Sequence, residues 1–180
     1  MHAIPDDLEH MFDVFGKPLT CELLSADDVP KPYHALLVHG HHMTRILEQY
    51  WDQPVVLHVL HHHQNETVYE RKISLSVDGH DHPVEYGAVR LHVDVCDPDV
   101  RSAILARRTP LGRILIDHGV MTNIECRCFF KMTPSREMCA TFGMPDSPLY
   151  GRYAEVDFDG KPALQLLEVL PAGLDKQNLK

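Results

Sequence analysis

The chain has 180 residues, 44% of them hydrophobic, which is long enough to bury the core of a single domain. Its net charge is −9 with neutral histidines, and its lysines and arginines form no cluster, so nucleic acid and membrane surfaces are not expected as partners. No stretch approaches the roughly 20 apolar residues of a membrane helix, and the five cysteines form no paired framework. We therefore expect one cytoplasmic domain over residues 1–180 that binds a small molecule or a protein, with its oligomeric state open.

The first half of the chain predicts helices followed by a β-meander. Residues 35–50 have a helical apolar spacing that Gly40 interrupts, so one broken helix or two short helices are expected after an early helical region. Residues 55–62, 67–77 and 84–93 are rich in β-forming side chains and are separated by turn sequences. These three segments predict a three-stranded antiparallel meander.

Two helices are predicted after the meander. Asp97 followed by Pro98, and Thr109 followed by Pro110, are typical of a helix N-cap and first turn. The first helix is expected to end at about Arg107 and the second before Gly119.

The remaining elements are a strand, a long loop and a hairpin, which together give an α+β fold. Residues 124–131 predict a strand. The prolines and glycine between 132 and 149 predict a long loop, which is either a lid or a surface connection without function. Residues 152–158 and 162–170 alternate in polarity on either side of Asp159-Gly160, a type I′ turn sequence, so they predict a β-hairpin.

Two charged residues lie where alternation predicts a buried strand face. In the segment 69–77 the odd positions are apolar except for Arg71, while the even positions are polar. Glu168 shares one side of a later strand with the leucines four and two residues before it and two after it. An unpaired buried charge costs several kcal/mol, so Arg71 and Glu168 are expected to form an ion pair or to meet a ligand of complementary charge.

Six short motifs occur in a specific order along the chain. They are His42-Met43-Thr44-Arg45-Ile46-Leu47-Glu48, Tyr69-Glu70-Arg71-Lys72-Ile73, Thr109-Pro110-Leu111-Gly112-Arg113, Tyr150-Gly151-Arg152, Gly160-Lys161-Pro162 and Leu167-Glu168-Val169-Leu170-Pro171. Over residues 36–171 this series resembles the chorismate lyase (4-hydroxybenzoate synthase) family and its chorismate-lyase-like relatives.

The resemblance implies a single antiparallel sheet with helices packed on it, and a ligand buried under flaps. It implies elimination of pyruvate from chorismate to give 4-hydroxybenzoate, without a metal or another cofactor. Arg71 would hold the ring carboxylate and Glu168 would lie by the hydroxyl end. Met43 and Leu111, with the adjacent Gly112, would form the apolar pocket, although apolar helix residues more often belong to the core.

The sequence departs from the family pattern at two of these positions. The family's glutamate falls on Leu167, so that Glu168 is one residue late and either a β-bulge intervenes or Glu168 has another role. The position of a second arginine in true lyases is occupied by Ala88 here. Arg90 lies two residues later, is expected to face the same side of the strand, and is a candidate substrate-binding residue. This change suggests an acidic ligand other than chorismate.

The chain contains 14 histidines, which raise the question of a metal site. His39, His41 and His42, and the run 61–63, invite that hypothesis, but no third ligand is identifiable and no metal is predicted. His42 and His118 flank the motifs of the expected pocket, and each has a side chain suited to acid/base chemistry near neutrality. The alternative for His118 is that it ends its helix.

Three functions follow from these observations. The leading one is a carbon–oxygen lyase that converts chorismate, with Arg71 and Glu168 as catalytic residues. The second is a lyase or dehydratase on another cyclic or aromatic acid, with histidines as acid/base groups. The third is a non-catalytic sensor domain that binds an aromatic acid.

Overall fold

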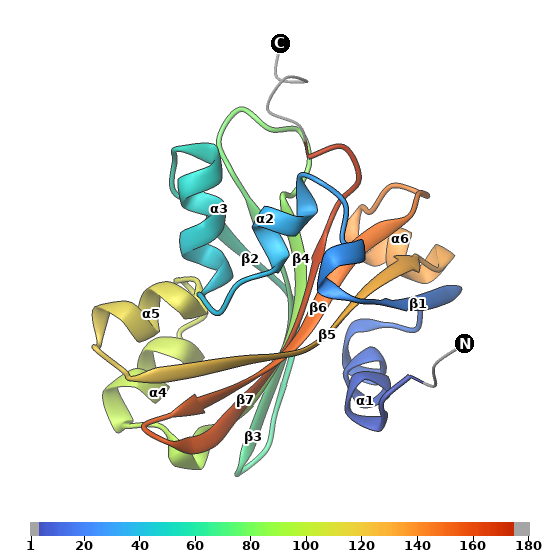
Figure 1. Cartoon of the computed structure of the whole chain (residues 1–180). Helices are drawn as coiled ribbons and strands as arrows, with labels where there is room; N and C mark the ends of the chain where they lie inside the picture. Colours follow the sequence, from blue (N-terminus) through green and yellow to red (C-terminus); the bar gives the residue numbers. More distant parts are fainter. Residues whose placement is uncertain (1–3, 175–180) are drawn as a thin grey trace.

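The computed structural model describes residues 4–174, and within them seven strands form one antiparallel sheet in the order β1-β5-β6-β7-β4-β3-β2 (Figure 1). The strands are β1 (Thr20–Leu24), β2 (Val56–Gln64), β3 (Val68–Ser76), β4 (Glu85–His92), β5 (Thr122–Thr133), β6 (Leu149–Phe158) and β7 (Lys161–Leu170). The predicted α+β fold with a single antiparallel sheet is confirmed.

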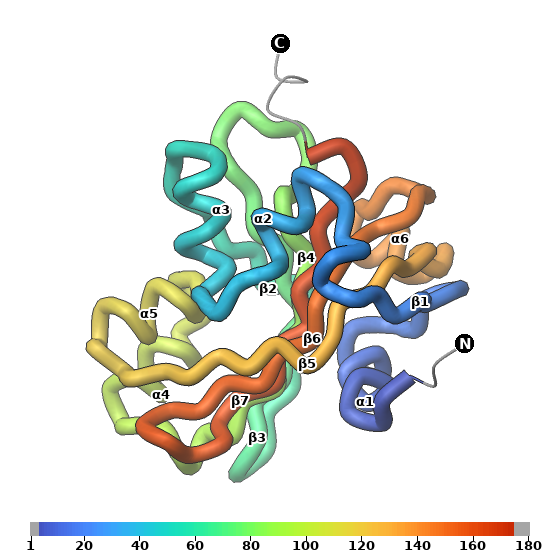
Figure 2. Tube along the Cα trace, in the orientation of Figure 1, coloured from blue at the N-terminus to red at the C-terminus, as the bar shows by residue number. Residues whose placement is uncertain are grey.

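Helices cover both faces of the twisted sheet (Figure 2). They are α1 (Asp6–Phe15), α2 (Tyr33–Leu37), α3 (Met43–Trp51), α4 (Pro98–Leu105), α5 (Leu111–Asp117) and α6 (Arg136–Phe142), with 3₁₀ turns at Ala26–Asp28 and Val93–Val95. Helices α1 and α6 pack on one face, whereas α2, α3, α4 and α5 pack on the other. No helix of the described residues is long and apolar enough to cross a membrane.

Helix α1 shows how the apolar pattern selects a face. Leu8, Met11, Phe12 and Phe15 recur at helical spacing and are all buried. Phe12 meets Phe130 of β5 edge-to-face, with ring centroids 5.7 Å apart. This contact fixes α1 on the face of the sheet that it shares with α6.

The meander and the final hairpin agree with the sequence predictions. Strands β2, β3 and β4 pair consecutively and antiparallel, and the segment before them forms two short helices, α2 and α3. Asp159 has φ 50° and Gly160 has φ 78°, which are the two left-handed residues that a type I′ turn requires.

The predicted loop over 132–149 is wrong in part, because it contains α6. The Ser135 hydroxyl accepts a hydrogen bond from the backbone N–H of Met138 at 3.3 Å, and Gly143 ends the helix with φ 69°. Met138 and Phe142 are buried against the face that α1 covers. The surrounding prolines and glycine favoured the prediction of a loop over this short amphipathic helix. Strand β1 was not predicted from the sequence.

A β-bulge lies in β7 between the turn and Glu168. Val156 pairs with Leu164 and Asp157 pairs with Pro162, so Ala163 is an additional residue without an opposite partner. The bulge inserts one residue between Gly160 and Glu168.

Candidate functional site

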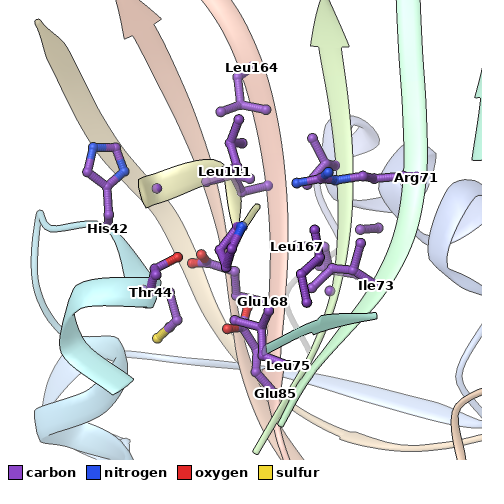
Figure 3. A pocket seen from close by; sticks show the side chains of 18 residues that line it. His42, Thr44, Arg71, Ile73, Leu75, Glu85, Leu111, Leu164, Leu167 and Glu168 are labelled. Atoms are coloured by element: carbon purple, nitrogen blue, oxygen red, sulfur yellow. The ribbon is translucent and has the colours of Figure 1, made fainter. Parts of the chain in front are cut away.

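A cavity of about 50 Å³ lies between the sheet and the first turns of α3 and α5 (Figure 3). Strands β3, β4 and β7 form its floor, and the two helix starts form its roof. Arg113 of α5 donates a hydrogen bond to Glu48 of α3, so an ion pair joins the two helices of the roof. The volume is sufficient for a few water-sized groups.

Arg71 extends from β3 into this cavity (Figure 3). It is opposite Val89 in the β3–β4 register and is only 2% exposed. Its Nε and Nη1 have no hydrogen-bond partner, and no carboxylate among residues 4–174 forms an ion pair with it. Burial lowers the pKa of Arg71, while the neighbouring Tyr69 phenol acts in the opposite direction. The guanidinium remains charged, because arginine does not lose its proton in proteins.

Glu168 lies on the same face of the sheet, but its partner is Arg152 and not Arg71. Arg152 is directly opposite it on β6, is fully buried, and donates from Nε to Glu168 Oε2 at 2.6 Å. The expected alternatives, an Arg71–Glu168 pair or two charges free for a ligand, are therefore replaced by one satisfied pair and one unsatisfied arginine.

The other nitrogens of Arg152 hold the chain between α2 and α3. Nη1 donates to the carbonyl oxygens of Leu37 and His39 at 3.2 and 2.8 Å, and Nη2 donates to that of His41 at 3.1 Å. His39 Nδ1 lies 3.1 Å from Nη1, and its Nε2 lies 2.8 Å from the carbonyl of Leu36, which assigns the proton to Nε2. Burial, and then the charge of Arg152, lower the pKa of His39.

Glu85, at the start of β4, is a cavity residue that the sequence did not single out. Its side chain is 3% exposed, and its Oε2 has no hydrogen-bond partner. Burial raises the pKa of Glu85 well above its ordinary value of 4.5, and the charge of Glu168 raises it further, whereas Arg152 lowers it. Burial therefore favours the protonated, neutral form of Glu85 over the carboxylate.

The roof contains four of the residues that the sequence associated with the pocket. Met43, Leu111, Gly112 and His42 all line the cavity. A Cβ atom on Gly112 would lie 2.9 Å from His42 Cβ, so only glycine allows this close approach of α5 to the start of α3. His42 Nε2 lies 3.1 Å from the Thr122 hydroxyl, and burial lowers the pKa of His42.

No protein-family model and no curated protein matches the sequence. Among solved structures, the effector domain of PhnF from Mycobacterium smegmatis is similar, with 12% identity, a TM-score of 0.56, and coverage of 74% of this chain and 90% of that one. A longer PhnF structure gives 12% identity and a TM-score of 0.55, with 75% and 65% covered. The ligand-binding domain of a putative GntR-family transcriptional regulator from Bordetella bronchiseptica gives 16% identity and a TM-score of 0.43, with 87% and 85% covered.

The chain has the chorismate-lyase-like fold. The similar structure with the higher TM-score is described as an effector domain and not as a lyase. The prediction of a carbon–oxygen lyase is therefore wrong, although the fold that accompanied it is correct. Glu168 is also held by Arg152 in a buried ion pair.

Two expected pocket residues of the chorismate-lyase-like domain do not line the cavity. Arg90 lies one residue beyond Val89 and so points to the opposite face of the sheet, where its Nε donates to Glu70 at 3.0 Å. It does share the side of Ala88, but the Ala88 side chain packs in the core cluster of α1 and α6, on the face opposite to Arg71. His118 is exposed at the C-terminus of α5, as the helix-end alternative predicted.

The histidine runs form no metal site in the part of the chain that the structure describes. Within residues 4–174, no three His, Cys, Asp or Glu side chains converge as metal ligands would. His61, His62 and His63 lie on the exposed edge strand β2, and His62 is hydrogen-bonded to Arg107.

We predict that Glu85→Gln changes the pH dependence of stability. Above pH 4.5 an unfolded Glu85 loses its proton while the folded one, whose pKa is raised, retains it. Wild-type stability then falls by about 1.4 kcal/mol per pH unit until the folded carboxyl also ionises. Glutamine has no such proton, so the stability of the variant relative to wild type should rise as the pH increases above about 5, as measured by urea unfolding.

The matched control for this prediction is Glu66→Gln, at an exposed position. Its stability should follow that of wild type at each pH. A constant difference between Glu85→Gln and wild type across the range would show that Glu85 is ionised in the folded protein.

Proposed function

We propose that the chain is a non-catalytic ligand-binding domain whose cavity takes up a small carboxylic acid, with Arg71 as the group that binds the carboxylate. The observation that carries this proposal is that the Arg71 guanidinium is buried without a hydrogen-bond partner at two of its nitrogens. A guanidinium that is 2% exposed and lacks partners at Nε and Nη1 has lost its water without gaining an anion. A carboxylate supplies both the charge and two parallel hydrogen bonds.

The charges around the cavity favour binding of a ligand's anionic group at Arg71 and not at another part of the cavity. Glu168 is neutralised by Arg152, and burial favours the neutral form of Glu85, whereas Arg71 is the one arginine or lysine in the described lining of the cavity and has no carboxylate partner. The surrounding wall is largely apolar, with leucines from β3, α5 and β7. Such a wall excludes water and strengthens the electrostatic attraction.

The size of the cavity restricts the acid. Its volume of about 50 Å³ is a third of the roughly 150 Å³ that accommodates benzene in an engineered protein cavity. A short aliphatic acid fits with little movement, whereas an aromatic or cyclic acid requires α3 and α5 to separate. The PhnF effector domain, which has the same fold, supports a binding role over a catalytic one.

The proposal is tested by calorimetric titration of wild-type protein with acids and their primary amides. The pairs are propionate with propionamide, butyrate with butyramide, and benzoate with benzamide. We expect at least one acid to bind, and its amide to bind at least about 30-fold more weakly, because the amide cannot neutralise the guanidinium. Chorismate incubated with the protein should be recovered without release of pyruvate.

Two outcomes would contradict the proposal. The first is equal affinity for each acid and its amide, which would exclude charge recognition. The second is the absence of binding by every acid while the protein remains folded by circular dichroism.

A further inference from the structure

We infer that the ligand is a zwitterion, with a cationic nitrogen remote from its carboxylate, and that Glu85 receives the nitrogen. This inference rests on the proposed function, because it assigns the second end of the ligand whose first end binds Arg71. It adds a binding residue at the other end of the cavity, together with a chemical class for the ligand.

The cavity contains an ionisable side chain without a hydrogen-bond partner at each of its two ends. At one end, Arg71 carries a positive charge without a carboxylate partner. At the other end two carboxyl groups, Glu85 and Glu168, face a single cation, Arg152, whose Nε donates to Glu168 alone. Each end therefore has a buried polar group without a partner, namely the Arg71 guanidinium at one end and Oε2 of Glu85 at the other. A ligand with one anionic and one cationic group supplies a partner to both.

The positions of the two groups set the separation between the ligand's charges. Arg71 is opposite Val89 and Leu75 is opposite Glu85, so the two charged residues are four strand positions apart. This corresponds to about 14 Å along the strands. Figure 3 shows Arg71 and Glu85 at different ends of the pocket. Side chains that converge on the cavity shorten this span, but it still favours an amino group several carbons from the carboxylate over an α-amino acid. In a cavity of about 50 Å³ such a ligand requires α3 and α5 to separate, as a cyclic acid does.

A second carboxylate or a hydroxyl is less suited to the Glu85 end than a cation. A ligand carboxylate there would be repelled by Glu168. A hydroxyl would bring no positive charge to Glu85 and Glu168, which share the single cation Arg152. Burial and the charge of Glu168 raise the pKa of Glu85 and so favour its protonated form in the free protein. When an ammonium group arrives, the Glu85 O–H bond ionises and the proton passes to the solvent.

The charged and titratable groups near Glu85 come from β7, from β6 and from the start of α3. Glu168 on β7 and Arg152 on β6 act on it directly, and His42 lies at the start of α3 in the roof. The adjacent positions of β3 and α3, Leu75 and Met43, are apolar. Proton release that disappears in Glu85→Gln is therefore assigned to Glu85 and not to His42.

The test compares ω-amino acids with the same acids lacking the amino group. The pairs are γ-aminobutyrate with butyrate and 5-aminopentanoate with pentanoate, titrated at pH 7.5 in phosphate and in Tris buffer. We expect one amino acid to bind wild type at least tenfold more tightly than its partner acid. Its heat of binding should differ between the two buffers because a proton is released, whereas the heat for the partner acid should not. In Glu85→Gln both differences should disappear.

The outcomes separate this inference from the proposed function. If the acids bind with dependence on Arg71 but the amino group gives no gain, the zwitterion is excluded and the carboxylate site remains. If neither member of any pair binds, both are overturned. The comparison of two ligands on wild type requires no variant, so it is decisive even if Glu85→Gln fails to fold.

Discussion

Replacing Arg152 by methionine is expected to lower the free energy of unfolding by about 3–5 kcal/mol, the cost of removing one partner of a buried ion pair. Methionine fills much of the same volume but leaves the Glu168 carboxylate without a cation, next to Glu85. The carbonyl oxygens between α2 and α3 also lose their donors, so this connection should loosen. Equilibrium unfolding in urea, followed by circular dichroism, measures the change.

Arg127→Met is the matched control, because it removes an arginine that forms ion pairs at the surface. Arg127 contacts Glu125 and Glu155, and its side chain is 45% exposed. Exposed pairs of this kind contribute little to stability, because solvent and salt screen them. An Arg152→Met protein that unfolds at the same urea concentration as Arg127→Met would show that the buried network contributes little.

Arg71→Met is expected to have the largest effect on ligand binding and the opposite effect on stability. Two charge-assisted hydrogen bonds of about 1.5–3 kcal/mol each correspond to a loss of affinity of roughly 100-fold or more. The ligand-free protein should be as stable as wild type or more stable by about 1–4 kcal/mol, because an unpaired buried charge is replaced by an apolar side chain. Calorimetry with the acid that binds wild type and thermal unfolding without ligand measure the two effects.

Arg90→Met provides the control for Arg71. Arg90 is a neighbour in the same β3–β4 ladder, but it lies on the other face and pairs with Glu70. Its replacement should leave the affinity for the acid within about threefold of wild type, since exposed and half-buried pairs contribute little. Equal losses in the two variants would show that the acid binds by long-range charge and not in the cavity.

Alternation in the sequence located two of the four buried charges in this site. Arg71 and Glu168 interrupt otherwise apolar faces of β3 and β7, and both are buried. Arg152 interrupts a similar face of β6, with Ala154, Val156 and Phe158 after it, so the same argument applied to that strand would have found it. Its partner could not be predicted, because the order of strands across the sheet is not encoded in any one strand.

Glu85 was concealed for a different reason. Strand β4 lies in the middle of the sheet, and residues on both of its faces are buried. The sequence of β4 therefore shows no alternation between a solvent-exposed polar face and a buried apolar face, so a buried carboxylate cannot be recognised from the pattern. Arg90 was misplaced for a related reason, because the sequence pattern did not show which of the two buried faces of β4 contains the cavity.

The motifs predicted the fold more successfully than the activity. The turn at Asp159-Gly160, the order of the strands along the chain and the helix starts all follow from local physical preferences that any protein with this fold shares. Activity depends instead on which charges in the cavity are free. Here the pairing of Glu168 with Arg152, from an adjacent strand, and the similarity to an effector domain replaced the lyase assignment.

The most direct test of the account observes the Arg71 side chain itself by NMR. In ¹⁵N-labelled protein, the Arg71 Nε–H signal is identified by its absence from Arg71→Met, and it is followed while the tightest-binding acid of the panel is added. We expect this signal to shift to the position of a hydrogen-bonded guanidinium, while the Arg152 Nε–H, already bonded to Glu168, changes little. A saturating acid that leaves the Arg71 signal unchanged would show that the carboxylate binds elsewhere and would contradict the assignment of this cavity as the ligand site.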